Sequence, residues 1–443
     1  MQKKRDGFTG SAGFILACIG SAVGMGNIWR FPTLVSGWGG MTFLIPYFIF
    51  VALIASTGVI GEMALGRHTG GGPVTAFSAC MKEGGRNASL GSAIGMIPVV
   101  GSLALAIGYT CVMGWIFRYA FMAISGQMTA MGQDMDLIGG TFERAASAGG
   151  STFWIIAAAA SSCLIMVFGV AGGIEKANRI MMPVLFFLFA GLGVYVFTLP
   201  GASGGLRYIM TLDPGGLKNP RLWIYAFGQA FFSLSVAGNG TVIYGSYLPK
   251  DEDIPRSAAV VAFFDTLAAL MAACVIIPAM ASGGAELSSG GPGLMFIYLV
   301  RVMNGMPGGW ILEIVFYVCI LFAGLSSIIN MYEVAVANLQ DSFGAARVPA
   351  SVIVHVFGGL SALFIQAIVS QWMDIVSIYI CPLGALLAGI MFFWVAGRDF
   401  VHAAVSEGSE RAPAPWFYPL SKYVYCAAAL TALIAGALMG GIG

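Results

Sequence analysis

The sequence predicts an all-α polytopic membrane protein, on the evidence of its composition, its apolar runs and its glycines. Of its 443 residues, 58% are hydrophobic and only 9% are charged. Soluble globular proteins carry roughly 25% charged residues, so this chain lacks the polar side chains to cover a water-facing surface. Apolar runs of about 20 residues, each long enough to cross a bilayer, recur along nearly the whole chain. These runs hold many of the 62 glycines and 18 prolines, whose freed backbone groups must find partners inside a helical bundle.

Eleven apolar runs predict eleven transmembrane helices in a single domain, residues 1–443. The expected ranges are 11–36, 41–65, 90–123, 152–170, 174–198, 223–248, 256–281, 308–343, 349–370, 372–398 and 415–441. The basic start precedes an apolar stretch with no recognisable cleavage site, so the first run is expected to span the membrane. Of the 21 Lys and Arg residues, fourteen fall on the N-terminal side of this arrangement and five on the other. Because positive charge concentrates in cytoplasmic segments, we expect a cytoplasmic N-terminus.

Composition also argues against several classes of protein. A net charge of +1 gives no sign of a nucleic acid or an acidic partner. The eight cysteines occur without a CxxC pair, and only three histidines are present, so neither a disulfide framework nor a zinc site is expected. The sequence contains no nucleophile–base constellation and no metal motif, so we do not expect an enzyme.

Two of the predicted helices are interrupted by glycines at corresponding places. The first contains GSAVGMGN (20–27) and the sixth contains FFSLSVAGNG (231–240). If 11–198 and 223–398 are repeats of five helices each, these helices open the two halves, and 415–441 is an added eleventh helix. A matched pair of interrupted helices indicates a binding site at the bilayer midplane. The alternative is that these glycines only allow close helix packing.

Ionisable side chains within membrane spans are rare and usually functional. Arg30 follows the first break and Asp374 begins the tenth span on the same side, so the two are expected to form a charged pair. Glu62, late in the second helix, is expected to accept hydrogen bonds from N–H groups freed in the sixth. Asp265 lies deep in the seventh span with no basic neighbour in sequence, which requires a cation or a proton. The alternative is an ion pair with Arg30 or Arg118 across the bundle.

Side-chain oxygens offer two places for such a cation. Ser326 and Ser327 lie in the eighth span within AGLSSIIN. Asn27, Ser233 and Asp265 offer another oxygen-rich set, which we call the first set; the two serines belong to the second. Hard cations such as sodium prefer oxygen ligands. The alternative for the two serines is that they bond only their own backbone.

The motifs around these residues resemble those of one transporter family. They are GSAVGMGNIWRFP, GWGGMTFLIPY, GEMALGR, FFSLSVAGNG, GGPGLMFI and AGLSS, in the family's order. The chain resembles the neurotransmitter:sodium symporter family, and within it the bacterial multi-hydrophobic amino acid transporters. This resemblance implies a five-plus-five inverted repeat with helices 1 and 6 broken. It also implies cotransport of one amino acid with two sodium ions across the bacterial inner (plasma) membrane.

The resemblance also implies roles for individual residues. The first sodium site would use the Ala22 carbonyl, Asn27, Ser233 and Asp265. The second would use carbonyls of Gly20, Val23 and Ala323 with the hydroxyls of Ser326 and Ser327. Substrate would contact Ala22, Gly24, Gly26, Leu105, Tyr109, Phe232, Ser235, Gly238 and Met331. Arg30 with Asp374 would form the outer gate, and Arg5 with Asp341 the inner one.

The fifth span carries Gly173 and Pro183, with nine residues between them. Glycine weakens a helix, and proline removes a hydrogen-bond donor and clashes with the preceding turn. The segment between them could therefore unwind and admit water to the second sodium site, as in the subgroup it resembles. A short loop followed by a proline-kinked helix is the alternative.

Apolar side chains dominate the expected substrate pocket, and apolar walls favour apolar ligands by burial. Tyr109 could offer its hydroxyl to a substrate carboxylate, or it could only satisfy a backbone carbonyl. We expect hydrophobic L-amino acids such as Trp, Phe, Tyr, Leu, Ile, Val and Met. A proton-coupled or facilitative amino-acid carrier of the same fold is the alternative function. The paired gates argue against a channel.

Gly238 generates a prediction about substrate size. A bulky residue there would fill space beneath Tyr109 and Phe232, so Gly238→Phe is expected to weaken tryptophan binding tenfold to a hundredfold more than valine binding, on the order of a few kcal/mol. Competition binding of the two amino acids measures this difference, with Gly238→Ala as the control. An equal loss for both ligands in both variants would show that only the backbone freedom of glycine matters.

Overall fold

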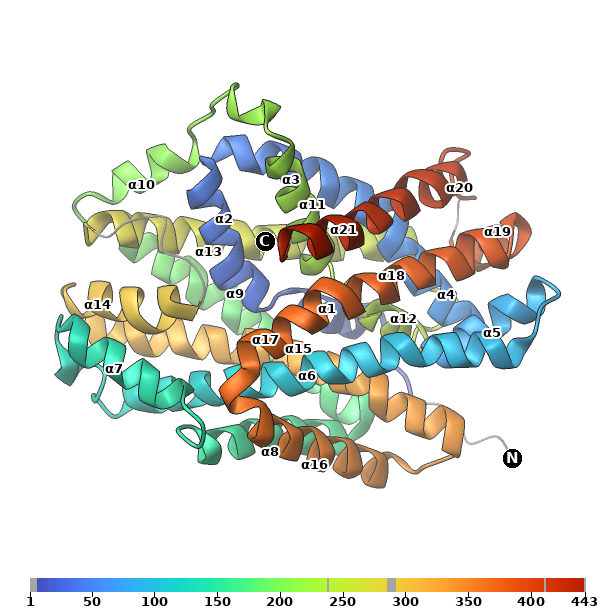
Figure 1. Cartoon of the computed structure of the whole chain (residues 1–443), viewed down its shortest axis with the longest axis horizontal. Coiled ribbons are helices and arrows are strands. Elements are labelled where there is room, and N and C mark those ends of the chain that lie inside the picture. Colours follow the sequence, from blue (N-terminus) through green and yellow to red (C-terminus); the bar gives the residue numbers. More distant parts are fainter. Residues whose placement is uncertain (1–5, 237–238, 285–291, 410–411, 442–443) are drawn as a thin grey trace.

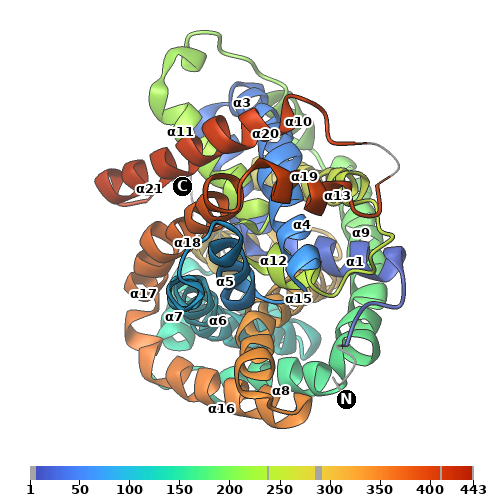
Figure 2. The same ribbon diagram turned by 90° about the vertical axis from the view of Figure 1, so that its right-hand side faces the viewer.

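The computed structural model describes residues 6–236, 239–284, 292–409 and 412–441 (Figure 1). Within these ranges the chain is helical, with short loops and no β-strand. Figure 2 shows the same bundle along its length, with many helices seen nearly end-on. The all-α prediction is therefore confirmed. Arg5 and Gly238, to which the sequence assigns an inner gate and a pocket wall, lie outside the described residues.

Helices occupy every range in which a span is expected. The first five ranges contain α1 (Ser11–Ala22) with η1 (Gly26–Arg30) and α2 (Phe31–Trp38), α3 (Met41–Ile54) with η2 (Ala55–Val59) and α4 (Ile60–Thr69), α6 (Ala88–Ile124), α8 (Thr152–Val167), and η4 (Val170–Glu175) with α9 (Lys176–Phe197). The next three contain α11 (Pro220–Ser233) with α12 (Gly240–Gly245), α13 (Ile254–Ser282) and α15 (Gly309–Phe343). The last three contain α16 (Arg347–Ile365), α17 (Val369–Ile375) with η9 (Val376–Ile380), α18 (Cys381–Gly389) and η10 (Ile390–Val395), and α20 (Phe417–Pro419) with η11 (Leu420–Tyr425) and α21 (Cys426–Met439).

Length and composition alone give fewer spans than the sequence predicts. Seven helices of the described part are long and apolar enough to cross a membrane, or up to eight if the bent first helix counts as one span. Three features lower the number: α8 has only 16 residues, the sixth expected span is divided into α11 and α12, and the stretch Arg347–Val395 reads as one helix of 49 residues. The count of eleven therefore stays a prediction.

Short connecting helices lie at the two ends of the bundle. They are α5 (Pro73–Glu83), α7 (Met135–Ala146), α10 (Ala202–Ile209), α14 (Leu299–Asn304) and α19 (Arg398–Ser406). In Figure 1, α7, α10 and α14 lie at the left end, and α5 and α19 lie at the right end with the N-terminus. Connections at both ends of the bundle are what a chain that crosses the membrane repeatedly requires. Which end faces the cytoplasm stays a prediction from the distribution of positive charge.

Polar groups gather inside the bundle and apolar side chains cover its outside. The long helices α6 and α15 pack along each other, and α1 contacts α9, α13 and α15. Large apolar side chains such as Phe187 (78% exposed), Phe364 (86%) and Leu438 (81%) face outward. Such a surface is stable only against lipid, so the buried polar groups between α1, α6, α13 and α15 are the candidates for function.

The segment between Gly173 and Pro183 is helical in this structure. Gly173 lies in the π-helical turn η4, and α9 continues through Pro183. A Cβ at Gly173 would lie 1.9 Å from the Ile165 carbonyl oxygen, so close packing against α8 also requires this glycine. The sequence predicted that this segment could unwind; the structure contains its wound form, with a π-helical turn where the glycine weakens it.

Close packing of α4 against α12 generates a prediction about stability. A Cβ at Gly66 would lie 1.9 Å from the backbone oxygen of Val242. Gly66→Ala is therefore expected to lower the free energy of unfolding by about 1–3 kcal/mol, because backbone atoms cannot move aside cheaply. Thermal unfolding in detergent measures this change. Gly191→Ala is the control, because that helical position is exposed with open space around it, and a large loss there would contradict the packing argument.

Candidate ion and substrate site

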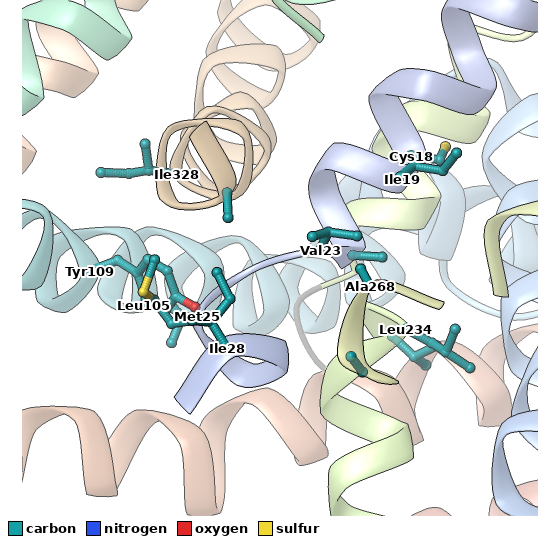
Figure 3. Close-up of a cluster of buried hydrophobic side chains, with 14 of the residues drawn as sticks. Cys18, Ile19, Val23, Met25, Ile28, Leu105, Tyr109, Leu234, Ala268 and Ile328 are labelled. Atoms are coloured by element: carbon teal, nitrogen blue, oxygen red, sulfur yellow. The ribbon is translucent and has the colours of Figure 1, made fainter. Parts of the chain in front are cut away.

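The first helix breaks after its third turn. α1 ends at Ala22, Val23 is extended (φ −72°, ψ 102°), and η1 resumes at Gly26 with a bend of 56° between the two parts. The Val23 N–H still bonds the Ile19 carbonyl at 2.7 Å. The regular helical hydrogen bonds stop at this linker: the Gly24 carbonyl accepts from the Asn27 N–H at 3.1 Å and the Val23 carbonyl lies 3.4 Å from Ser327 Oγ. Figure 3 shows this linker passing beside α6, with Met25 close to Leu105 and Tyr109.

The sixth helix breaks between α11 and α12. Ser235 (φ 57°) and Asn239 (φ 50°) flank the break, and they are the non-glycine residues of the described part with positive φ. Such backbone strain concentrates at functional sites. Buried Glu62 supports the break by accepting hydrogen bonds from Asn239 Nδ2 at 2.8 Å and from Thr241 Oγ1. The sequence predicted backbone N–H groups as the donors to Glu62, whereas among the described residues the side chains of Asn239 and Thr241 donate.

Asp265 connects the two broken helices. Its carboxylate accepts hydrogen bonds from Asn27 Nδ2 at 2.7 Å and from Ser233 Oγ at 2.7 Å. Asn27 Nδ2 also lies 3.1 Å from Ser233 Oγ, and all three side chains are at most 1% exposed. The alternative ion pair is wrong: within the described residues Asp265 has no basic partner, and Arg118 donates to the Gly150 carbonyl at 2.6 Å. A buried carboxylate with only neutral donors still requires a cation or a proton.

The second oxygen set joins α1 to α15. Ser326 and Ser327 each donate to the Ala323 carbonyl at 3.0 Å, as the alternative explanation predicted. Ser327 Oγ also lies 3.4 Å from the Val23 carbonyl, so the set bridges the two helices. A Cβ at Gly20 would lie 2.9 Å from Ser326 Cβ. The carbonyls and hydroxyls of this set therefore converge on one buried place.

A cavity of about 40 Å³ lies between the two sets. Eight of the expected substrate contacts line it: Ala22, Gly24, Gly26, Leu105, Tyr109, Phe232, Ser235 and Met331. Ion-set members Asn27, Ser233 and Ser327 also line it. Glycine at the linker matters here, because a Cβ at Gly24 would lie 2.6 Å from Ser327 Oγ and one at Gly26 would lie 3.1 Å from the Phe232 ring. The cavity and the oxygen sets are thus one connected site.

Of the two expected gates, the outer one has both members among the described residues, and its arrangement differs from the expected one; Arg5 of the inner gate lies outside those residues. Arg30 and Asp374 line a common cavity with Phe232, and the Arg30 guanidinium lies 5.2 Å from the centre of the Phe232 ring. Among the described residues, Arg30 and Asp374 do not form the expected ion pair. The Arg30 guanidinium packs on the Phe232 ring in a favourable cation–π geometry. At the other end, Asp341 Oδ2 lies 3.4 Å from the Gly72 N–H.

Two charged pairs lie at the end of the bundle near the N-terminus. Sequence reasoning did not identify them. Buried Glu333 pairs with Arg347 at 2.6 Å. Glu175 pairs with Arg179 at 2.6 Å and accepts a bond from the Thr9 N–H at 2.7 Å. Spacing along one helix reveals only the Glu175–Arg179 pair, because Glu333 and Arg347 lie on different helices.

Three cavity residues were also missed. Ser21, Ser102 and Asn330 line the cavity and are at most 7% exposed. Asn330 ends the AGLSSIIN motif and donates to the Gly240 carbonyl at 3.4 Å, which links α15 to the second break. Asn330 follows Ser327 by three positions and therefore lies on the same face of the helix, which could have identified it as a cavity residue. Ser21 and Ser102 carry no comparable pattern.

Comparisons with known proteins agree with this arrangement. The model of the sodium:neurotransmitter symporter family matches residues 5–132 and 141–439. An uncharacterised sodium-dependent transporter of Bacillus subtilis is 32% identical over 92% of this chain and 92% of its own length. One from Methanocaldococcus jannaschii is 29% identical over 95% of this chain and 88% of its own length. A crystal structure of MhsT in complex with L-phenylalanine, 30% identical, superposes with a TM-score of 0.84 over 97% of this chain and 99% of that one.

These matches cover nearly the whole chain and both broken helices, and they confirm the family resemblance and the fold predicted from the motifs. The relatives are transporters that depend on sodium, and not enzymes. The chain belongs to the sodium:neurotransmitter symporter family.

Proposed function

We propose that this protein is a symporter that imports hydrophobic and aromatic L-amino acids together with two sodium ions by alternating access. The observation that carries the proposal is the shared lining of the cavity and the two oxygen sets. Asn27, Ser233 and Ser327 belong to both, so a substrate in the cavity and cations in the sets would touch the same side chains. Shared contacts give the coupling free energy that cotransport needs.

The chemistry of each set supports sodium. The first offers the Asp265 carboxylate and the Ser233 hydroxyl, with the Ala22 carbonyl nearby. The Asn27 amide would turn its oxygen to the cation, because without one its Nδ2 donates to Asp265 and its Oδ1 accepts from the Gly24 N–H. The second offers only neutral oxygens. Hard monovalent cations suit such oxygen cages, whereas soft metals prefer sulfur or imidazole. A substrate carboxylate would supply further negative charge beside the first set, close to the N-terminal end of the resumed helix Gly26–Trp38.

The cavity walls support an apolar side chain in the substrate. Leu105, Phe232 and Met331 present apolar surface, and Tyr109 places its hydroxyl near Gly24 on the opposite side. Burial of apolar surface favours hydrophobic amino acids at about 25 cal/mol per Å². Methionine adapts its shape, which suits a pocket that accepts several sizes. The L-phenylalanine bound to MhsT is a ligand of this class.

Two further proposals concern organisation. We take 11–198 and 223–398 as the inverted repeats and 415–441 as the added helix, because each half opens with a broken helix. Arg30 with Asp374, and Arg5 with Asp341, remain the proposed outer and inner gates. A proton at Asp265 in place of the first sodium defines the alternative, a proton-coupled carrier, since a carboxylate with neutral donors also binds a proton.

Sodium dependence is the first test. Two sodium ions at 100 mV contribute about 4.6 kcal/mol, which supports accumulation on the order of a thousandfold. Uptake of labelled phenylalanine, leucine, valine and tryptophan into proteoliposomes is expected to collapse when choline or potassium replaces sodium. Empty liposomes measure the leak. Concentrative uptake that persists without sodium and follows a pH gradient would support the proton-coupled carrier instead.

Chloride dependence tests the role of Asp265. Asp265 belongs to the first set, and its fixed negative charge balances the charge of the bound cation. Transport is therefore expected to be independent of chloride. Asp265→Asn is expected to lose transport, or to regain it only with chloride present. Uptake in gluconate and in chloride measures the effect. Asp213→Asn, a loop carboxylate that caps the Gly215 N–H at 2.8 Å, is the control. A strict chloride requirement in the unmodified protein would contradict this role.

A further inference from the structure

Asn178 is a buried polar side chain that neither the motifs nor the proposed ion sets include. It lies in α9, three residues after the π-helical turn η4, and its side chain is 0% exposed. Its Oδ1 atom is buried and accepts no hydrogen bond within the described part of the chain. An unpaired amide oxygen in an apolar interior destabilises the folded chain, so a compensating role is expected.

The orientation of this amide is fixed by its other end. Asn178 Nδ2 donates to the Ile174 carbonyl at 2.9 Å. A carbonyl can only accept, so the nitrogen must face Ile174 and the oxygen must face away from α9. The oxygen is therefore aimed into the bundle rather than turned at random.

The oxygen points at the second ion set. A Cβ built on Gly20 would lie 2.0 Å from Asn178 Oδ1 and 2.9 Å from Ser326 Cβ. Adding one carbon–carbon bond places Oδ1 within about 3.5 Å of the Gly20 Cα. Gly20 and Ser326 are both proposed ligands of the second cation, so an unpaired oxygen from a third helix lies against two residues of this set, one from α1 and one from α15.

We propose that Asn178 Oδ1 is a further ligand of the cation at the second set, and that it ties the cation to α9. This inference rests on the proposed function. It gives the unpaired oxygen its partner, and it explains why the helix beside η4 carries a polar residue that faces inward. Because Gly20 has no side chain, the oxygen can approach the set without steric conflict.

The position of Asn178 connects the cation to the end of the bundle near the N-terminus. Its amide bonds Ile174 within η4, and the next residue of that turn, Glu175, binds Thr9 and Arg179. Unwinding of η4 and the first turn of α9 would move Asn178 away from Gly20. Loss of one ligand would then weaken the second cation at the moment when this end of the bundle opens.

Sodium alone tests the proposal, with no substrate present. The melting temperature of the purified full chain in detergent is measured as sodium chloride replaces choline chloride at constant ionic strength, because a bound ion stabilises the folded state. Asn178→Leu removes the oxygen while keeping the volume. It is expected to raise the sodium concentration for half-maximal stabilisation about tenfold, the loss of one oxygen contact to a charged group. Asn178→Asp keeps an oxygen and is expected to bind sodium at least as tightly as the unmodified chain.

Asn304→Leu is the matched control. Asn304 also has a buried, unpaired Oδ1 and an Nδ2 that donates to the Met128 and Gly132 carbonyls, but it lies on α14 outside both ion sets. Its loss is expected to change the melting temperature without changing the sodium concentration for half-maximal stabilisation. If the role of Asn178 were purely structural, Asn178→Leu would likewise change the melting temperature without changing the sodium concentration for half-maximal stabilisation.

The outcomes separate this inference from the proposed function. If sodium does not stabilise the unmodified chain, the proposed sodium coupling is contradicted. If sodium stabilises it and Asn178→Leu responds at the same concentration, only the role of Asn178 is overturned. Asn178→Asp that responds as weakly as Asn178→Leu overturns it too. Should Asn178→Leu fail to fold, Asn178→Ser, whose hydroxyl is too short to reach Gly20, carries the same comparison.

Discussion

The buried carboxylate of Asp265 is the interaction on which the centre of this protein depends. It draws Asn27 from the first broken helix and Ser233 from the sixth onto one point of α13, at 2.7 Å each. Neutral donors cannot remove the cost of a buried charge, so the site is incomplete without a cation or a proton. The breaks in both helices follow from this requirement, since only unwound backbone offers free carbonyls at this depth.

Glycine makes the arrangement possible. The linker between α1 and η1 passes so close to its neighbours that side chains at Gly24 or Gly26 would collide with Ser327 or Phe232. Close approach brings the cavity and the oxygen sets together, and shared residues then couple them physically. Strain at Asn239 is held by Glu62, whose bond to Asn239 fixes the start of α12, and strained Ser235 donates to the Ser21 carbonyl at 2.8 Å. Rigid support around a strained break is typical of a preorganised binding site.

Much of this was readable from the sequence, because lipid imposes strong rules on a chain. Apolar runs predicted where helices lie, and all the expected ranges are helical. Glycine-rich interruptions predicted the two breaks, and motif resemblance placed most of the cavity lining. Asp265 was recognisable as a lone carboxylate within an apolar run. The family, the fold and the region of the site therefore follow from local composition and from short motifs, which do not depend on how helices are oriented about their axes.

Tertiary structure decided what depends on contacts between helices. Sequence could not exclude an ion pair for Asp265. It predicted a pair between Arg30 and Asp374, whereas in the described part of the chain Arg30 packs on Phe232. It did not reveal the buried pair of Glu333 with Arg347, or the inward-facing oxygen of Asn178. Hydropathy reports that a residue is in the membrane, but rotation and packing of each helix decide which polar atoms meet. Some of those contacts join residues more than a hundred positions apart, such as Gly20 and Asn178, and even Glu333 and Arg347 lie on different helices, so no local pattern encodes them.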